Sequence, residues 1–148
     1  MKSHPHVKGI LFDLPHVVSK SQLSSNFANR VQVVGGSFFD VATIPKGADA
    51  YIMKHIIHDW SDEKSVEILK NVRSCVGPHS KLLLTERICN FNDPLISFLD
   101  LQMFCLVDGK ERTRGEFEEL LSKAGFKLTE VHRSSENPSF TVIEAVPL

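Results

Sequence analysis

Three residues that lie far apart in the sequence have the side-chain types of a general base and its supporting acids: His58, Glu86 and Glu111. A carboxylate that accepts a hydrogen bond from one ring nitrogen of a histidine fixes its tautomer and leaves the other nitrogen free to accept a proton. The sequence therefore permits a site in which His58 is the base. The plainer alternatives are a polar surface histidine, a solvated strand end at Glu86, and an exposed ion pair between Glu111 and Arg112.

Alternating strands and helices must position these side chains. Apolar and β-branched runs between turn signals predict strands at residues 7–12, 31–34, 50–53, 81–85, 127–133 and 139–146. The first of these runs, ended by Asp13-Leu14-Pro15, is expected to be a buried strand. Helices are expected at about 17–28, from Ser61 to Gly77, at 95–107, and from Thr113 to Gly125.

Local signals support the predicted helices. Ser61 is a plausible N-cap before Asp62 and Glu63, and Thr113 with Glu116 has the spacing of a capping box. Apolar residues recur at helical spacing in each helix, which predicts one buried face. These faces comprise Val66, Leu69, Val72 and Val76; Ile96, Leu99, Met103 and Leu106; and Phe117, Leu120, Leu121 and Ala124.

This order of elements predicts an α/β fold with a doubly wound, mostly parallel sheet, covered on both faces and closed by an antiparallel strand pair. Ligands of such folds lie beyond the carboxyl ends of the strands. That rule selects Asp13, Ser37, residues 54–60 and Glu86.

Composition excludes several classes of protein. The chain has 148 residues, 42% hydrophobic and 24% charged, with a net charge of −1, which suits one globular domain and gives no case for binding nucleic acid or an anionic membrane. The three cysteines form no CxxC pair, and the first residues have no apolar signal core. We therefore expect a reduced, cytoplasmic protein.

Six segments occur in the order and spacing of a known family: residues 12–17 (FDLPHV), 35–39 (GGSFF), 53–63 (MKHIIHDWSDE), 86–88 (ERI), 109–113 (GKERT) and 124–126 (AGF). Together they resemble the S-adenosylmethionine-dependent O-methyltransferases of the plant caffeate and flavonoid type and acetylserotonin O-methyltransferase. The resemblance covers nearly the whole chain. It implies a Rossmann-like methyltransferase fold, with residues 1–148 forming a single partial catalytic domain.

The resemblance also implies a set of cofactor contacts. Asp13, followed by Leu14, matches the strand-end acid that accepts hydrogen bonds from the cofactor ribose, and Ser37 with Phe38 matches the adenine-contacting stretch, where the family usually has aspartate in place of Ser37. Lys54 resembles a lysine that lines the cofactor pocket, and Trp60 an aromatic wall near the adenine. A turn or helix cap is the alternative for Asp13, and core packing is the alternative for Trp60.

In the same way, His58 matches the catalytic base, Glu86 and Glu111 match the acids that bracket it, and Asp59 and Met103 fall at substrate positions. Core filling remains an equal alternative for Met103. The implied reaction is attack of a hydroxyl oxygen of a small, phenolic molecule on the methyl group of S-adenosylmethionine, which yields S-adenosylhomocysteine. The family expectation includes no metal, and a homo-oligomer.

One departure from the family concerns the glycine-rich GxGxG turn and its strand, which are expected before Asp13 and are not found in the sequence. In this fold that strand lies between those ending at Asp13 and Met53, so two unpaired edges should face each other. The chain is then expected to rearrange, to pair these edges, or to pair with another chain. A non-catalytic remnant or interaction module is therefore a competing hypothesis, and a generic nucleotide-binding protein is a third.

Overall fold

The computed structural model describes residues 4–21, 29–89, 94–107, 109–133 and 141–148. Its strands are β1 (Gly9–Asp13), β2 (Val31–Gly35), β3 (Ala50–Lys54), β4 (Lys81–Glu86), β5 (Phe126–Arg133) and β6 (Thr141–Pro147). Its helices are α1 (Pro15–Val18), the 3₁₀ turn η1 (Ile57–Asp59), α2 (Asp62–Arg73), α3 (Pro94–Val107) and α4 (Arg114–Lys123).

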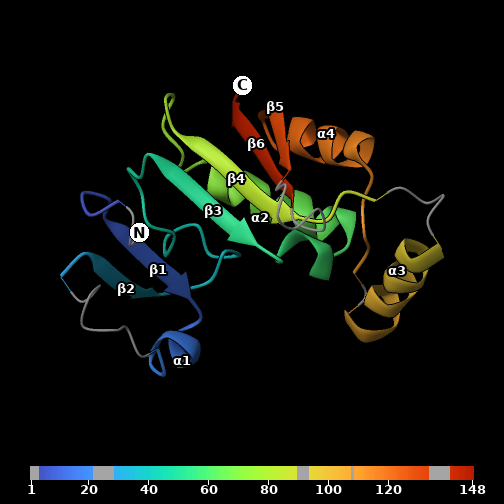
Figure 1. Cartoon of the computed structure of the whole chain (residues 1–148). Helices are drawn as coiled ribbons and strands as arrows, with labels where there is room; N and C mark the ends of the chain where they lie inside the picture. The colour runs from blue at the N-terminus through green and yellow to red at the C-terminus, as the bar shows by residue number, and fades with distance from the viewer. Residues whose placement is uncertain (1–3, 22–28, 90–93, 108, 134–140) are drawn as a thin grey trace.

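The strands form two sheets (Figure 1). β1 and β2 are a parallel pair, and the second sheet has the order β3-β4-β6-β5, in which β3 and β4 are parallel and β6 is antiparallel to both of its neighbours. The predicted α/β architecture and its antiparallel final pair are confirmed. The register of β3 and β4 pairs Lys54 with Thr85, so the turn after β3 lies beside Glu86 at the end of β4.

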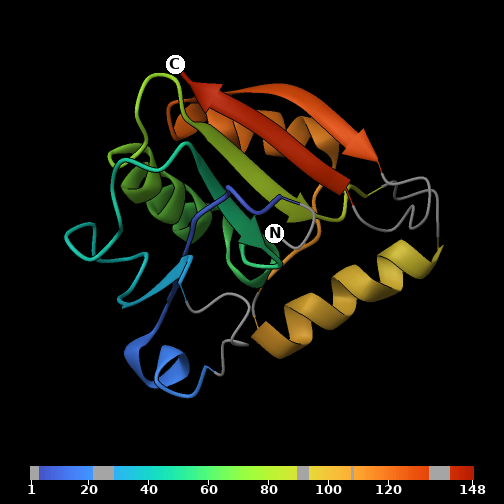
Figure 2. The same cartoon turned by 60° about the vertical axis from the view of Figure 1, so that its left-hand side comes forward.

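The core lies between the four-stranded sheet and two helices. α2 and α4 lie on the same face of this sheet in Figures 1 and 2, and they contact each other. Alternate side chains of β4 and β6 are buried in one hydrophobic cluster with most apolar positions of both helices. They include Leu82, Leu84, Ile143, Ala145, Ile68, Leu69, Phe117 and Leu121. On the neighbouring strand β3, Ile52 is 69% exposed, so in the described residues the expected helical cover of both faces is not seen.

The helix boundaries largely follow the predicted caps. The Ser61 hydroxyl accepts a hydrogen bond from the backbone N–H of Lys64, and Thr113 and Glu116 form a complete capping box. The predicted inner face of α4 is buried at all four positions. α2 ends at Arg73, four residues before Gly77, and the predicted face position Val76 is buried in the turn that follows. On α3, the side chains of Ile96, Leu99 and Leu106 lie outside the described residues.

The small sheet differs from the prediction. The first strand was expected to be buried, but in β1 Ile10 is 43% and Leu11 38% exposed, because the strand pairs only with β2 and its covering helix α1 has four residues. The remainder of the helix expected at 17–28 lies largely outside the described residues. Among described residues β1 pairs only with β2 and β3 only with β4, so the two edges do not close the gap.

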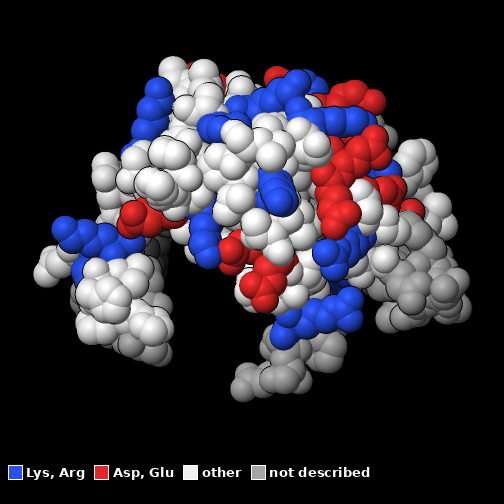
Figure 3. Space-filling model, turned by 90° about the horizontal axis from the view of Figure 1, so that it is seen from above, with Lys and Arg blue, Asp and Glu red and all other residues white. Residues whose placement is uncertain are grey.

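The surface charges and the lengths of the helices give no sign of a nucleic-acid-binding or membrane-spanning protein in the described residues. On the face shown in Figure 3, positive and negative side chains are interspersed. None of the helices in the described part of the chain has the length and apolar character needed to cross a membrane.

Candidate active site

A short, irregular turn carries His58 from the end of β3 to the start of α2. His55 has a φ of 52°, in the left-handed region that side chains other than glycine seldom adopt. The chain then forms the 3₁₀ turn η1, in which Ile57 is completely buried and anchors the turn in the core. His58 is consequently held at the carboxyl edge of the sheet by a buried neighbour, with its own side chain 16% exposed.

Glu86 fixes this turn through hydrogen bonds to its backbone. One of its carboxylate oxygens, Oε1, accepts hydrogen bonds from the backbone N–H groups of Ile56 (3.1 Å) and Ile57 (2.8 Å). The other oxygen, Oε2, lies 3.9 Å from His58 Nδ1 and has no hydrogen-bond partner among the described residues. Glu86 is 1% exposed, and burial raises the pKa of its carboxyl group. The solvated strand end considered for Glu86 is therefore wrong.

Glu111 reaches His58 from a segment more than fifty residues away. The chain at residues 109–112 runs parallel to residues 88–89: Ile88 bridges to Arg112, and the Cys89 N–H donates to the Arg112 carbonyl. This pairing places Glu111 Oε1 3.6 Å from His58 Nδ1. Glu111 and Arg112 are both buried, so the alternative of an exposed ion pair is wrong.

The two ring nitrogens of His58 have different surroundings. Nδ1 faces Glu86 and Glu111, whereas Nε2 lies 3.4 Å from the half-exposed carboxylate of Asp59. The interaction with Glu111 raises the pKa of His58, and burial partly opposes this rise. If Nδ1–H is directed toward the acids, Nε2 is the nitrogen that can accept a proton from a ligand.

Arg112 organises the same turn, a role that differs from the exposed ion pair considered for it from the sequence. Its side chain is completely buried and donates hydrogen bonds to the carbonyls of Ile57 (2.9 Å) and Trp60 (2.8 Å), and to the Ser65 hydroxyl (3.2 Å). Its charge is paired with Asp62, at the first position of α2. Arginine is seldom buried. The position of Arg112 in the sequence does not indicate that it binds these carbonyls, because they are brought together only in the folded turn.

Three further residues support Glu111 and the turn. Asp100 of α3 accepts a 2.7 Å hydrogen bond from the Glu111 N–H, and the Cys89 thiol lies 3.9 Å from Glu111 Oε2. Burial, and then the charge of Glu111, raise the pKa of the Cys89 thiol to about 12, so it remains protonated near neutral pH and can donate to Glu111. Gly109 packs directly against the carbonyl oxygen of His58.

The predicted cofactor residues lie at the carboxyl ends of β1, β2 and β3. The Asp13 side chain is exposed and accepts a 2.7 Å hydrogen bond from the N–H of Leu14. Leu14, and not Asp13, is the N-cap of α1, so the helix-cap alternative for Asp13 is wrong. The bond from the Leu14 N–H is the local contact that the turn-cap alternative expects. The Ser37 hydroxyl accepts a bond from the Phe39 N–H (3.2 Å), and Lys54 is exposed at the last position of β3.

An aromatic cluster links two of these segments. The ring of Trp60 lies edge-on to Phe38 and Phe39, with centroid separations of 5.9 and 4.9 Å, and the three rings pack against the core. Asn71 of α2 donates a hydrogen bond to the Phe38 carbonyl. Trp60 therefore packs against the core, which agrees with the core-packing alternative. The aromatic cluster also joins the segment after β2 to the turn that carries His58.

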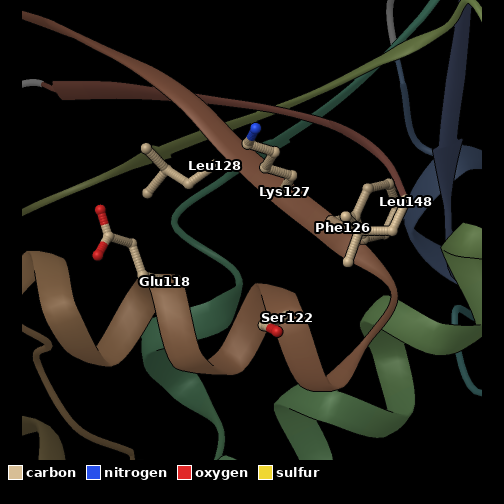
Figure 4. Close-up of a pocket in the computed structure, with 6 residues that line it drawn as sticks. All are labelled: Glu118, Ser122, Phe126, Lys127, Leu128 and Leu148. Atoms are coloured by element: carbon tan, nitrogen blue, oxygen red, sulfur yellow. The ribbon is translucent and has the colours of Figure 1, made fainter.

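The substrate positions are less enclosed. Met103 is half-buried on α3, the helix that lies to one side of the sheet in Figures 1 and 2 and contacts the η1 turn. A separate, open depression of about 230 Å³ lies between α4 and β5 (Figure 4). Glu118, Ser122, Phe126, Lys127, Leu128 and Leu148 line it, and none of the predicted site residues is among them.

Known proteins are similar to this chain in sequence and in fold. Residues 1–127 match the O-methyltransferase domain family, and the chain belongs to this family. Phenazine O-methyltransferase PhzM of Lysobacter antibioticus is 37% identical over the whole chain, and 8-amino-8-demethylriboflavin N,N-dimethyltransferase of Streptomyces davaonensis is 36% identical over 86% of it. The matched regions are 44% and 38% of those relatives, so the chain spans about two fifths of their length.

A solved structure supports the fold assignment. The neocarzinostatin-biosynthesis O-methyltransferase NcsB1, in complex with S-adenosylmethionine and 2-hydroxy-5-methyl naphthoic acid, aligns with 99% of this chain and 43% of its own. The TM-score is 0.85 and the identity 29%. This likeness over nearly the whole chain confirms the predicted Rossmann-like methyltransferase fold.

Proposed function

We propose that this chain carries the base and part of the cofactor site for methyl transfer from S-adenosylmethionine to a hydroxyl oxygen of a small molecule. The observation that supports it most is the environment of His58. Two buried carboxylates, Glu86 and Glu111, face its Nδ1, while Nε2 lies on the other side of the ring. A histidine held in this way is suited to accept a proton at a defined atom.

The chemistry sets what the residues must do. A phenol with a pKa near 10 is a weak acid for a histidine with a pKa near 6.5, and full proton transfer before attack costs about 5 kcal/mol. The raised pKa of His58 reduces this mismatch. S-adenosylmethionine supplies an electrophilic methyl group on a positive sulfonium. Nε2 of His58 would accept the proton that the hydroxyl loses as its oxygen is methylated.

The described residues fit part of this cofactor. Asp13 presents an exposed carboxylate at a strand end, where it can accept hydrogen bonds from two neighbouring hydroxyl groups of a ribose. Ser37, Phe38, Lys54 and Trp60 lie on the segments that follow β2 and β3. We extend to them the cofactor role that the family implies, and to Met103 and Asp59 the substrate role.

The relatives supply the substrates that we propose to test. NcsB1 has been solved with 1,4-dihydroxy-2-naphthoic acid, which makes that compound a suitable first substrate to test here. The riboflavin relative methylates an amine, so amino acceptors are a second candidate. We favour a hydroxyl, because a hydroxyl oxygen must lose its proton as it is methylated, and the acids behind His58 stabilise the cation that forms.

We also propose that the protein is a homo-oligomer. Within the described residues β1 and β3 each pair on one side only, and an open strand edge pairs readily with another chain. Light scattering at several concentrations tests this, and a monomer at every concentration would contradict it.

Titration calorimetry with S-adenosylhomocysteine tests the proposed function directly. We expect micromolar binding to the 148-residue chain, weakened at least tenfold by Asp13→Asn and unchanged by Asp40→Asn, which alters an exposed loop acid. Methyl transfer to 1,4-dihydroxy-2-naphthoic acid should accompany binding. No binding at millimolar S-adenosylhomocysteine would instead support the non-catalytic interaction module.

A further inference from the structure

Two histidines and a carboxylate converge where β3 and β4 end. His55, His58 and Glu86 each offer one donor atom, and the three atoms lie within 4.8 Å of one another. The two imidazole rings are 5.3 Å apart and tilted by 35°. His55 has no part in the proposed methyl transfer, so its place in this cluster is not explained by that reaction.

The unsatisfied oxygen of Glu86 points to a ligand at this position. Glu86 is 1% exposed, and its Oε2 has no hydrogen-bond partner among the described residues, although it lies 3.9 Å from His58 Nδ1. A buried carboxylate oxygen is normally paired, hydrogen-bonded or bound to a metal. A cation between Glu86 and the histidines would satisfy this oxygen.

The backbone conformation of His55 is consistent with a ligand-binding site. Its φ of 52° is unfavourable for a residue with a side chain, and strained backbone of this kind is concentrated at functional sites. The conformation is fixed by the hydrogen bond from the His55 N–H to the Thr85 carbonyl, and by Glu86 Oε1, which binds the next two N–H groups. Within this turn the rings of His55 and His58 are neighbours.

We propose that His55, His58 and Glu86 bind a divalent transition-metal ion, with Zn²⁺ as the representative. Two imidazoles and one carboxylate are a common zinc donor set, with metal–ligand distances of roughly 2.0–2.2 Å. The donors lie close enough to reach one ion after small side-chain rotations. Glu111, 3.6 Å from His58, adds negative charge, whereas Lys54 and Arg87 near His55 oppose it.

This site is inhibitory and not a cofactor site. A metal that occupies a nitrogen of His58 and the carboxylate of Glu86 withdraws both from proton transfer. The proposal concerns binding, so it does not depend on whether the chain methylates a substrate.

Calorimetry with zinc chloride alone tests the proposal on the 148-residue chain. We expect one ion per chain with micromolar affinity, weakened at least tenfold by His55→Gln and by Glu86→Gln. The matched control is His132→Gln, which removes a surface histidine 3.3 Å from Glu144 and should leave the affinity unchanged. Circular dichroism establishes whether each variant is folded. If Glu86→Gln does not fold, the result for His55→Gln decides the test.

Cobalt substitution adds a spectroscopic readout. Co²⁺ at a site with two imidazoles and a carboxylate should give visible absorption bands that His55→Gln removes and His132→Gln retains. No binding by the wild-type chain at millimolar zinc would overturn the proposal. Retention of full affinity in folded His55→Gln would do so too, because the ion would then be held elsewhere on the surface.

Discussion

The buried guanidinium of Arg112 donates a 2.9 Å hydrogen bond to the carbonyl of Ile57, the residue that precedes His58. A second nitrogen of the same group donates to Trp60, at the other end of the turn. The position of His58 is therefore set by an arginine fifty-four residues later in the chain. Loss of the side chain removes the charged donor from both carbonyls, which then keep only longer bonds from the Ser65 hydroxyl and, at Ile57, from the Trp60 N–H.

Arg112→Met tests this arrangement. Two carbonyls lose their charged donor at a cost of about 1–3 kcal/mol each, so we expect a destabilisation of roughly 2–6 kcal/mol in urea unfolding. Arg114→Met is the control, because Arg114 is exposed and pairs with Glu118 in an interaction worth about 0.3–0.5 kcal/mol. Equal stability losses in the two variants would contradict the role assigned to Arg112.

Gly109→Ala tests how closely the two segments approach. A Cβ at this position would overlap the carbonyl oxygen of His58 and crowd the backbone of Asp59, so the turn must shift. We expect a loss of about 1–3 kcal/mol in the free energy of unfolding. Gly115→Ala makes the same change in α4, where the new Cβ meets nothing within 4 Å, and should stabilise the chain by up to about 1 kcal/mol.

Sequence patterns predicted the elements that have strong local signals. The caps at Ser61 and Thr113 and the apolar face of α4 were confirmed. Capping and helical periodicity depend on residues within a few positions of each other, so they can be predicted from a short stretch of sequence. The exposure of β1 was missed, because burial depends on what covers a strand and not on the strand's own residues.

The candidate site shows the same division. His58, Glu86 and Glu111 were grouped from their residue types and from family resemblance, and the structure brings all three together. Arg112, Asp100 and Gly109 were missed, because their partners are backbone atoms of distant segments. Main-chain carbonyls and N–H groups are common to nearly all residue types, so the sequence alone does not indicate which of them will form hydrogen bonds with each other.

Glu111→Gln tests the electrostatics of the base. The carboxylate of Glu111 is the chief cause of the raised pKa of His58, so its neutral replacement should lower that pKa. A base must be neutral to accept a proton, and its rate therefore rises as pH increases through its pKa. The rising limb of the pH–rate profile, and the His58 ring titration followed by NMR, should both move to lower pH.

The matched control for this shift is Glu119→Gln, which removes an exposed carboxylate that pairs with Lys123. It should leave the His58 titration where it is in the wild-type chain. If the His58 titration is identical in Glu111→Gln and Glu119→Gln, the proposed coupling between Glu111 and His58 is wrong.

Hydrogen exchange tests the division of the strands into two sheets. β4 and β6 alternate fully buried side chains under two helices, whereas β1 and β2 have no buried position and only a four-residue helix. Local opening is easier where little apolar area is buried. Amides of Leu11 and Val33 should exchange at least tenfold faster than those of Leu84 and Ile143. Equal protection would indicate one cooperative sheet.

His58→Gln separates catalysis from cofactor binding. The amide keeps much of the volume of the imidazole but is not a base near neutral pH, so methyl transfer should fall by about 10²–10⁴-fold. Binding of S-adenosylhomocysteine should change by less than about threefold, because the proposed cofactor contacts begin at Asp13 and do not include the ring of His58. His79→Gln, at an exposed position in the turn before β4, should leave both measurements unchanged. Equal losses of binding and transfer in His58→Gln would show that His58 supports the site as a whole, and the base would have to be another group.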